Sequence, residues 1–211
     1  GILEAMNKYN AANTVYANIS KESPVSWTAR LRSANNLKAL DLEIEAIDLL
    51  EELSSEQPNR PDPLVSLGDL LREKKRFLES VEAYDRAIAC LGKLDKRHWT
   101  IFYSRGISLE RSKNWKGAEK DFQIALGLSP DQPYVLNYLG YSWVDQGVNL
   151  DNARKMIERA VKLRPNDGYI VDSLGWAFYR LKKYGAAVKQ LERAAELRPQ
   201  DPTINDHLGD A

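Results

Sequence analysis

Few residues of this chain could act in catalysis, and they stand apart from one another. The chain has two histidines, His98 and His207. His98 stands beside Trp99, where a role in capping or packing is far more common than catalysis. His207 lies between Asp206 and Asp210, and a helix brings side chains three residues apart to the same face. This spacing fits a His–carboxylate pair, but it is also typical of a solvated acidic face, which we expect here.

The sequence lacks the motifs that usually accompany catalysis or metal binding. It contains no HExxH, GxxxxGK[ST], CxxC or GxSxG pattern. Its one cysteine, Cys90, excludes a disulfide framework and a cysteine-rich zinc site. We therefore predict that the protein is not an enzyme and that it has no catalytic residues, no metal site and no cofactor.

Charge and hydropathy narrow the class of partner. The 30 Lys and Arg residues balance 30 Asp and Glu residues. A net charge of zero argues against nucleic-acid binding, which needs a basic surface, and against a polybasic membrane patch. No apolar run is long enough to cross a bilayer, so no membrane insertion is predicted. Another protein or a peptide is the expected partner, and the oligomeric state stays open.

The elements that would position these residues follow a repeat of about 34 residues. A proline closes each unit, at Pro24, Pro58, Pro130, Pro165 and Pro199, with two units between Pro58 and Pro130. A Leu-Gly pair recurs at 67–68, 139–140, 174–175 and 208–209. A small residue follows it at Ala46, Ser80, Ala118, Ala153 and Ala187, and a large one four positions later at Leu50, Tyr84, Phe122, Ile157 and Leu191.

These columns predict two helices in each unit. Apolar residues three, four and seven positions apart form one stripe on each helix, and the proline ends the second helix. Small facing residues let two backbones approach closely, so Gly140 and Gly175 are expected at helix crossings. We predict an all-α chain without strands. First helices should begin near Ser26, Pro61, His98, Gln132, Asp167 and Asp201, and second helices near Glu43, Phe77, Trp115, Leu150 and Tyr184.

The pattern resembles the tetratricopeptide repeat, with its W-x2-L-G-x2-Y, A-x3-F and P signature, over nearly the whole chain. The resemblance implies an α-solenoid of helix-turn-helix pairs in a right-handed superhelix. The register gives one array, residues 1–211, with complete repeats at 27–60, 61–98, 99–132, 133–167 and 168–201. Partial repeats at 1–26 and 202–211 lead us to expect a fragment of a longer protein. Extra residues around 92–96 predict a longer connection, or a second helix that continues past Leu91.

The C-terminal third resembles a narrower group. Residues 136–141, 163–176 and 204–210 are similar to the C-terminal region of exported, multi-repeat proteins of Proteobacteria. One branch of that group resembles outer-membrane lipoprotein adaptors that dock a periplasmic carboxyl-terminal processing protease onto substrates. The resemblance implies a bacterial adaptor in the assembly of an envelope protease complex. It also implies a location in the periplasm or at the periplasmic face of the outer membrane, with the cytoplasm as the alternative.

In this repeat family, one stripe of each first helix lines a concave groove for partners. The resemblance implies that the groove residues here are Tyr103, Tyr134, Asn137, Tyr138, Tyr141, Tyr169, Asp172, Trp176 and Tyr179, and His207 falls on the same stripe. Aromatic side chains often anchor interfaces, and an asparagine can hydrogen-bond to a peptide backbone. We predict a scaffold or adaptor that holds a partner segment in this groove. The alternative is a structural spacer or oligomerisation module whose aromatic residues only pack.

Overall fold

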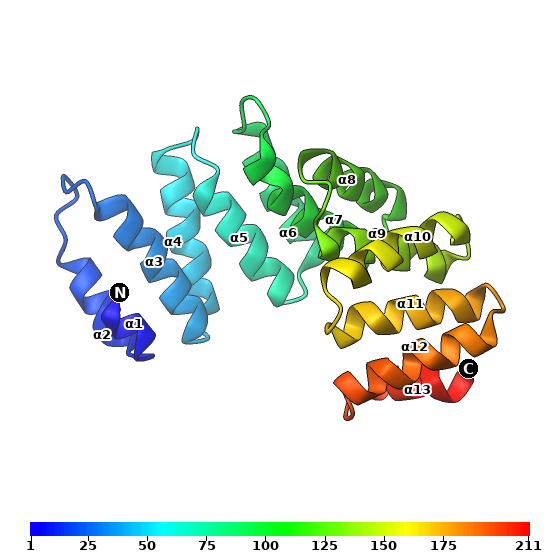
Figure 1. The fold of residues 1–211 in the computed structure, drawn as a ribbon. Helices are drawn as coiled ribbons and strands as arrows, with labels where there is room; N and C mark the ends of the chain where they lie inside the picture. The colour runs from blue at the N-terminus through cyan, green and yellow to red at the C-terminus, as the bar shows by residue number, and fades with distance from the viewer. The chain divides into compact units, whose positions relative to one another are not determined.

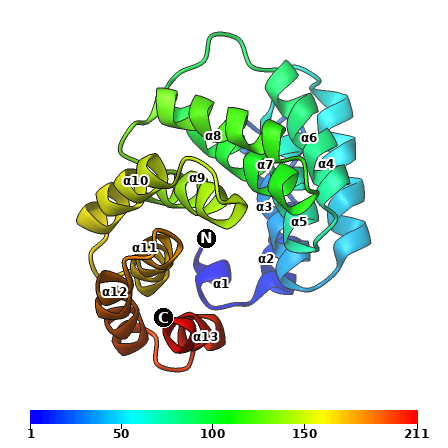
Figure 2. The ribbon, with the colours of Figure 1, turned by 90° about the vertical axis from the view of Figure 1, so that its right-hand side faces the viewer.

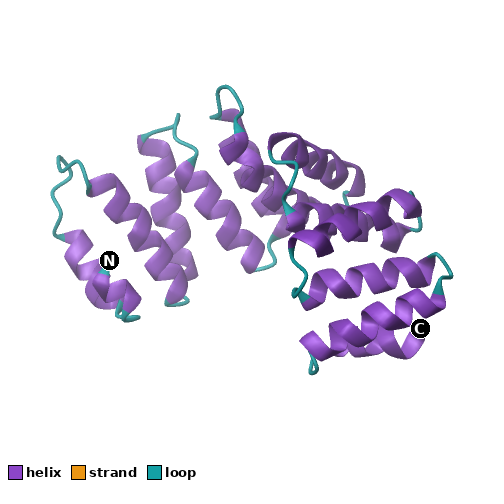
Figure 3. Cartoon of the chain, viewed as in Figure 1, coloured by secondary structure: helices purple, strands orange, loops and turns teal.

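The computed structural model describes residues 1–211 and is built from helices and connecting loops, with no strand (Figure 3). The α-helices are α1 (Ile2–Ala5), α2 (Tyr9–Ala17), α3 (Ser26–Ala39), α4 (Glu43–Glu56), α5 (Asp62–Glu73), α6 (Phe77–Ala89), α7 (Trp99–Arg111), α8 (Trp115–Leu128), α9 (Pro133–Gln146), α10 (Leu150–Leu163), α11 (Gly168–Arg180), α12 (Tyr184–Leu197) and α13 (Pro202–Asp210). One 3-10 turn, η1 (Lys96–His98), precedes α7. The predicted all-α class is confirmed.

Every predicted helix start lies within one residue of an observed one. The reason is local chemistry. The side chain of Asp167 accepts hydrogen bonds from the backbone N–H groups of Tyr169 and Ile170, and Asp201 caps α13 through the N–H of Ile204. Pro133 and Pro202 occupy the first position of their helices, where the missing N–H costs nothing.

The turn inside each helix pair contains a residue with left-handed backbone conformation, and the turn between α9 and α10 contains two, Gly147 and Asn149. The φ angles are 58° at Asp41, 61° at Lys75, 66° at Lys113, 72° at Gly147 and 58° at Lys182. Only Gly147 adopts this conformation without steric cost. The repeat pattern predicted a turn at each of these places but not its left-handed conformation, because lysine rarely adopts a positive φ.

The chain divides into two compact units. The first holds residues 1–94 and 104–118, and the second holds residues 95–103 and 119–211. Within each unit, helices pack against their neighbours in the sequence, as α11, α12 and α13 do in the orange-to-red part of Figure 1. None of the helices is both long and apolar enough to cross a membrane.

Glycines lie where the paired helices cross, as predicted. A Cβ at Gly175 would lie 2.5 Å from Cγ of Leu191, and one at Gly140 would lie 2.7 Å from Cγ1 of Ile157. Leu191 and Ile157 are fully buried members of the large-residue column. The seam between α11 and α12 therefore requires a residue without a side chain at position 175.

The connection between α6 and α7 is longer than the others, as the extra residues predicted. Residues 90–98 separate these helices, whereas residues 164–167 separate α10 from α11. The alternative, a second helix continuing past Leu91, is wrong, since α6 ends at Ala89. The side chain of Asp95 accepts a hydrogen bond from the backbone N–H of Arg97 and begins the 3-10 turn.

Candidate partner-binding face

The first helices of the second unit carry most of the predicted groove residues. α11 contacts both α9 and α13, and the three helices lie side by side in Figures 1 and 2. α9 contributes Tyr134, Asn137, Tyr138 and Tyr141, and α11 contributes Tyr169, Asp172, Trp176 and Tyr179. We call the surface of α9, α11 and α13 the first-helix face.

A stack of rings stands at the centre of α11. The ring of Trp176 lies parallel to that of His207 in α13, with centroids 4.2 Å apart and an angle of 13° between the planes. It also stacks on Tyr179, at 4.8 Å and 18°. All three side chains are partly buried. The contacts thus hold the rings in fixed orientations while part of their surface remains accessible.

A buried carboxylate fixes the histidine of this stack. Oδ1 and Oδ2 of Asp172 lie 3.0 and 3.1 Å from Nδ1 of His207. Their side chains are only 8% and 12% exposed, respectively. Asp206 and Asp210 are exposed, as the prediction of a solvated acidic face requires. The prediction missed that His207 itself is partly buried and pairs with Asp172 of the preceding repeat. The useful signal in the sequence was the repeat spacing between positions 172 and 207.

Tyr103 and Tyr138 lie in a second aromatic cluster. The ring centroid of Tyr138 lies 6.0 Å from that of Tyr103 and 5.5 Å from that of the fully buried Phe122. Tyr103 also contacts Trp99, at 5.8 Å. These two tyrosines therefore pack between helices of the second unit, although both remain partly exposed.

Asn137 differs from its neighbours on α9. Its Oδ1 atom is buried and has no hydrogen-bond partner. A buried polar atom left without a partner is costly, and a bound ligand is one of the groups that can satisfy it. Tyr141, one turn further along α9, is partly buried.

Tyr134 and Tyr169 stand at the first turns of α9 and α11, and both are well exposed, by 40% and 50%. Each supports an arginine. The guanidinium carbon of Arg164 lies 5.6 Å from the ring centroid of Tyr134, and that of Arg198 lies 4.7 Å from the ring centroid of Tyr169. Both distances are within the range of a cation–π interaction.

The other candidate groups have structural roles. Nδ1 of His98 accepts a hydrogen bond of 3.0 Å from the backbone N–H of Asp95, which confirms the predicted capping role. Sγ of Cys90 lies 3.1 Å from the carbonyl oxygen of Pro58. The structure brings together no group of three or more His, Cys, Asp or Glu side chains that could hold a metal ion.

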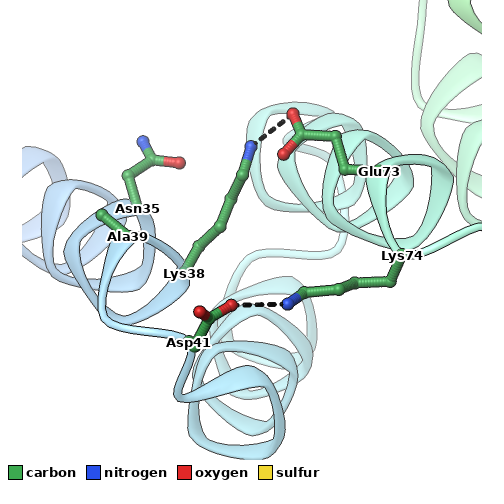
Figure 4. Close-up of a pocket in the computed structure, with 6 residues that line it drawn as sticks. All are labelled: Asn35, Lys38, Ala39, Asp41, Glu73 and Lys74. Carbon is green, nitrogen blue, oxygen red and sulfur yellow. Dashed lines mark hydrogen bonds and ion pairs between the residues drawn. The ribbon is translucent and has the colours of Figure 1, made fainter.

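The first unit contains a cavity of about 560 Å³ between the ends of α3 and α5, shown in Figure 4. Its charged groups neutralise each other. Nζ of Lys38 lies 2.6 Å from Oε1 of Glu73, and Nζ of Lys74 lies 2.7 Å from Oδ1 of Asp41. Because these charges are already paired within the protein, the cavity offers little to a charged ligand.

Comparisons with known proteins agree with the repeat pattern. The sequence model of the tetratricopeptide repeat family matches residues 144–202. The TPR repeat-containing protein PA4667 of Pseudomonas aeruginosa is 31% identical over 159 residues, which are 75% of this chain and 26% of that protein. The chain thus spans about a quarter of the length of this relative.

Solved structures show the same fold. PilF of Pseudomonas aeruginosa superimposes with a TM-score of 0.83 at 14% identity, covering 99% of this chain and 93% of that one. YrrB, described as a TPR protein with an unusual peptide-binding site, gives a TM-score of 0.69 at 17% identity, covering 87% and 91%. MamA gives 0.71 at 17% identity, covering 84% and 94%. At these identities the similarity concerns the fold alone.

Proposed function

Since the chain belongs to the tetratricopeptide repeat family, we propose that it is a non-catalytic scaffold that binds a segment of a partner protein on its first-helix face. The observation that carries this proposal is the ring stack of Trp176, Tyr179 and His207. Ordered aromatic rings lose little conformational entropy on binding, so they make effective anchors.

A polar group of α9, on the same first-helix face as the stack, would orient the bound segment. The unpartnered Oδ1 of Asn137 is the acceptor that would take a hydrogen bond from a backbone N–H of the segment. The carboxylate of Asp172 is already bonded to His207, so its role is to hold the stack. Tyr141 and Tyr138 extend the aromatic surface along α9.

The class of partner follows from the narrower resemblance of the C-terminal third. That resemblance supports an adaptor that assists the assembly of a protease complex in the bacterial envelope. It also supports a location in the periplasm or at the inner side of the outer membrane. A protease of the carboxyl-terminal processing class is therefore the first partner to test.

One observation favours the alternative, a spacer or oligomerisation module. Tyr103 and Tyr138 pack against the fully buried Phe122, which is how aromatic residues fill a seam. This alternative predicts that removing the aromatic residues of α11 lowers stability and leaves binding unaffected.

The two functions separate in one experiment. Peptides that bind the immobilised chain are selected from a random display library, and their affinities are measured by fluorescence polarisation. Trp176→Ala should weaken binding by about 30-fold or more, because a central anchor of an interface is worth about 2 kcal/mol. Trp115→Ala is the matched control, since Trp115 is also partly buried but lies on the second helix α8.

Circular dichroism gives the melting temperature of each variant. A lower melting temperature with unchanged affinity of the folded protein would reject the binding face in favour of packing. The proposal would also be rejected if no peptide were selected, or if the selected peptides did not compete with one another for a single site.

A further inference from the structure

Arg164 and Arg198 are unusual among the arginines of this chain, because their guanidinium groups have no hydrogen bond or ion pair. Every other arginine has at least one such partner. The two residues stand at equivalent places in consecutive repeats, just after α10 and α12. Two unpaired charges at matching positions suggest a shared role.

Each guanidinium is held in place from one side. That of Arg198 lies over the ring of Tyr169, and that of Arg164 lies over the ring of Tyr134. Stacking on a ring occupies one flat face of the guanidinium and leaves its N–H edges free to donate. Such an edge matches the two oxygens of a carboxylate.

A glycine at position 168 leaves room for the side chain of Arg198. A Cβ at Gly168 would lie 2.6 Å from Cγ of Arg198 and 3.3 Å from Cβ of Leu197. Any side chain at position 168 would therefore push the stem of Arg198 away. The absence of a side chain lets the arginine lie close to the start of α11, where Tyr169 follows.

Both arginines line one pocket of about 360 Å³, together with Leu163, Pro165, Asn166 and Asp167. Its only carboxylate, Asp167, is engaged by the N–H groups at the start of α11. A second pocket, of about 430 Å³, is also lined by Arg198, together with Tyr169 and Asp201. Asp201 likewise caps its helix. Neither of the two guanidinium groups in the pocket that both arginines line is therefore paired with a carboxylate.

We infer that these two pockets form a docking surface for an acidic segment of a partner protein, whose Asp or Glu side chains pair with Arg164 and Arg198. This surface is separate from the ring stack of the first-helix face. The positive charge here is local, in a chain whose net charge is zero, which suits a few carboxylates better than a polyanion. The paired oxygens of a carboxylate also fit the guanidinium edge directly.

The test uses the whole chain and a short fluorescein-labelled peptide of alternating glutamate and glycine, with glutamine in place of glutamate as the neutral peptide. Arg198→Gln and Arg164→Gln should each weaken binding of the acidic peptide by about tenfold at low salt, the usual worth of a charge-assisted hydrogen bond. Lys155→Gln removes the same charge from an exposed site on α10 and should leave binding unchanged.

Gly168→Ala distinguishes geometry from charge. It keeps every charged group but displaces Arg198, so it should weaken the acidic peptide nearly as much as Arg198→Gln does. Trp176→Ala should have no effect, which separates this surface from the ring stack of the first-helix face. In NMR titrations, the acidic peptide should shift the amide signals of the non-proline residues in 163–170 and 197–202.

Three results would overturn the inference. One is that the neutral peptide binds as tightly as the acidic peptide. Another is that Lys155→Gln weakens binding as much as the arginine variants do, since that loss would reflect the general charge of the protein. The third is tighter binding of duplex DNA or of anionic lipid vesicles than of the acidic peptide, with the same dependence on both arginines.

Discussion

Single glycines decide how closely the paired helices approach, and two glycines of the same repeat should respond in opposite ways to substitution. At Gly175, an added side chain would meet Leu191, including its backbone nitrogen at 3.2 Å, so the α11–α12 seam would have to open. Gly175→Leu should therefore destabilise the protein by about 1–3 kcal/mol or more.

Gly185, in α12, is the control. A Cβ at this position meets nothing within 4 Å, and leucine favours a helix more than glycine by roughly 0.5–1 kcal/mol. Gly185→Leu should leave stability unchanged or raise it slightly, as measured by urea denaturation. Equal effects of the two substitutions would contradict the role assigned to the seam.

At the same scale, the sequence shows which residues share the first-helix stripe but not which of them touch. The spacing placed Asp172, Trp176 and His207 on that stripe. It did not reveal the hydrogen bond between Asp172 and His207, which lie in consecutive repeats. Which side chains come within hydrogen-bonding distance depends on how α11 packs on α13. The pairs of Arg164 with Tyr134 and of Arg198 with Tyr169 could not be predicted either, because both arginines lie just after a helix, where the sequence has no helical periodicity.

Between elements, an ion pair links α4 and α6 and should make the first unit sensitive to acid. Nη1 and Nη2 of Arg86 donate to the two carboxylate oxygens of Glu51, both at 2.8 Å. These hydrogen bonds lower the pKa of Glu51 below its ordinary value of 4.5. A carboxyl group whose pKa is lower in the folded state stabilises that state above the unfolded pKa, and the gain disappears as the pH falls.

Glu51→Gln should therefore lower stability at pH 7, by less than about 1 kcal/mol because solvent screens a half-exposed pair. The difference from the parent protein should shrink once the pH falls below about 4.5. Urea denaturation at neutral and at acidic pH measures both values. The control is Glu45→Gln, at an exposed position of α4 without an ion pair, and its effect on stability should not depend on pH. If Glu51→Gln lowered stability equally at both pH values, the stabilising role of the ion pair would be contradicted.

Helix positions were predictable because caps, prolines and apolar spacing are local features, whereas the backbone conformation of the turns inside the pairs was not. Lys75, Lys113 and Lys182 take a left-handed conformation that lysine does not favour. The packing of two helices forces that conformation, so residue type alone could not indicate it. The long connection after α6 was visible as extra residues, but its 3-10 turn depends on the capping by Asp95.

For the whole molecule, the contacts imply that damage in one part stays local. In the second unit, α9 contacts α10 and α11, α11 contacts α12 and α13, and α12 contacts α13. In the first unit, α3 contacts α4 and α5, and α5 contacts α6. A repeat array of this kind gains its stability from neighbouring pairs, so it has no single core whose loss unfolds the entire chain.

Gly175→Leu provides the test, because it opens a seam inside the second unit. Hydrogen exchange followed by mass spectrometry should show faster exchange in α11 and α12, and in α10 and α13, which pack directly against them. Exchange in α3 to α6 should remain at the level of the parent protein. Gly185→Leu serves as the control and should leave all of these helices unchanged. If Gly175→Leu accelerated exchange equally along the whole chain, the array would unfold as one cooperative unit, and the local coupling inferred from its contacts would be wrong.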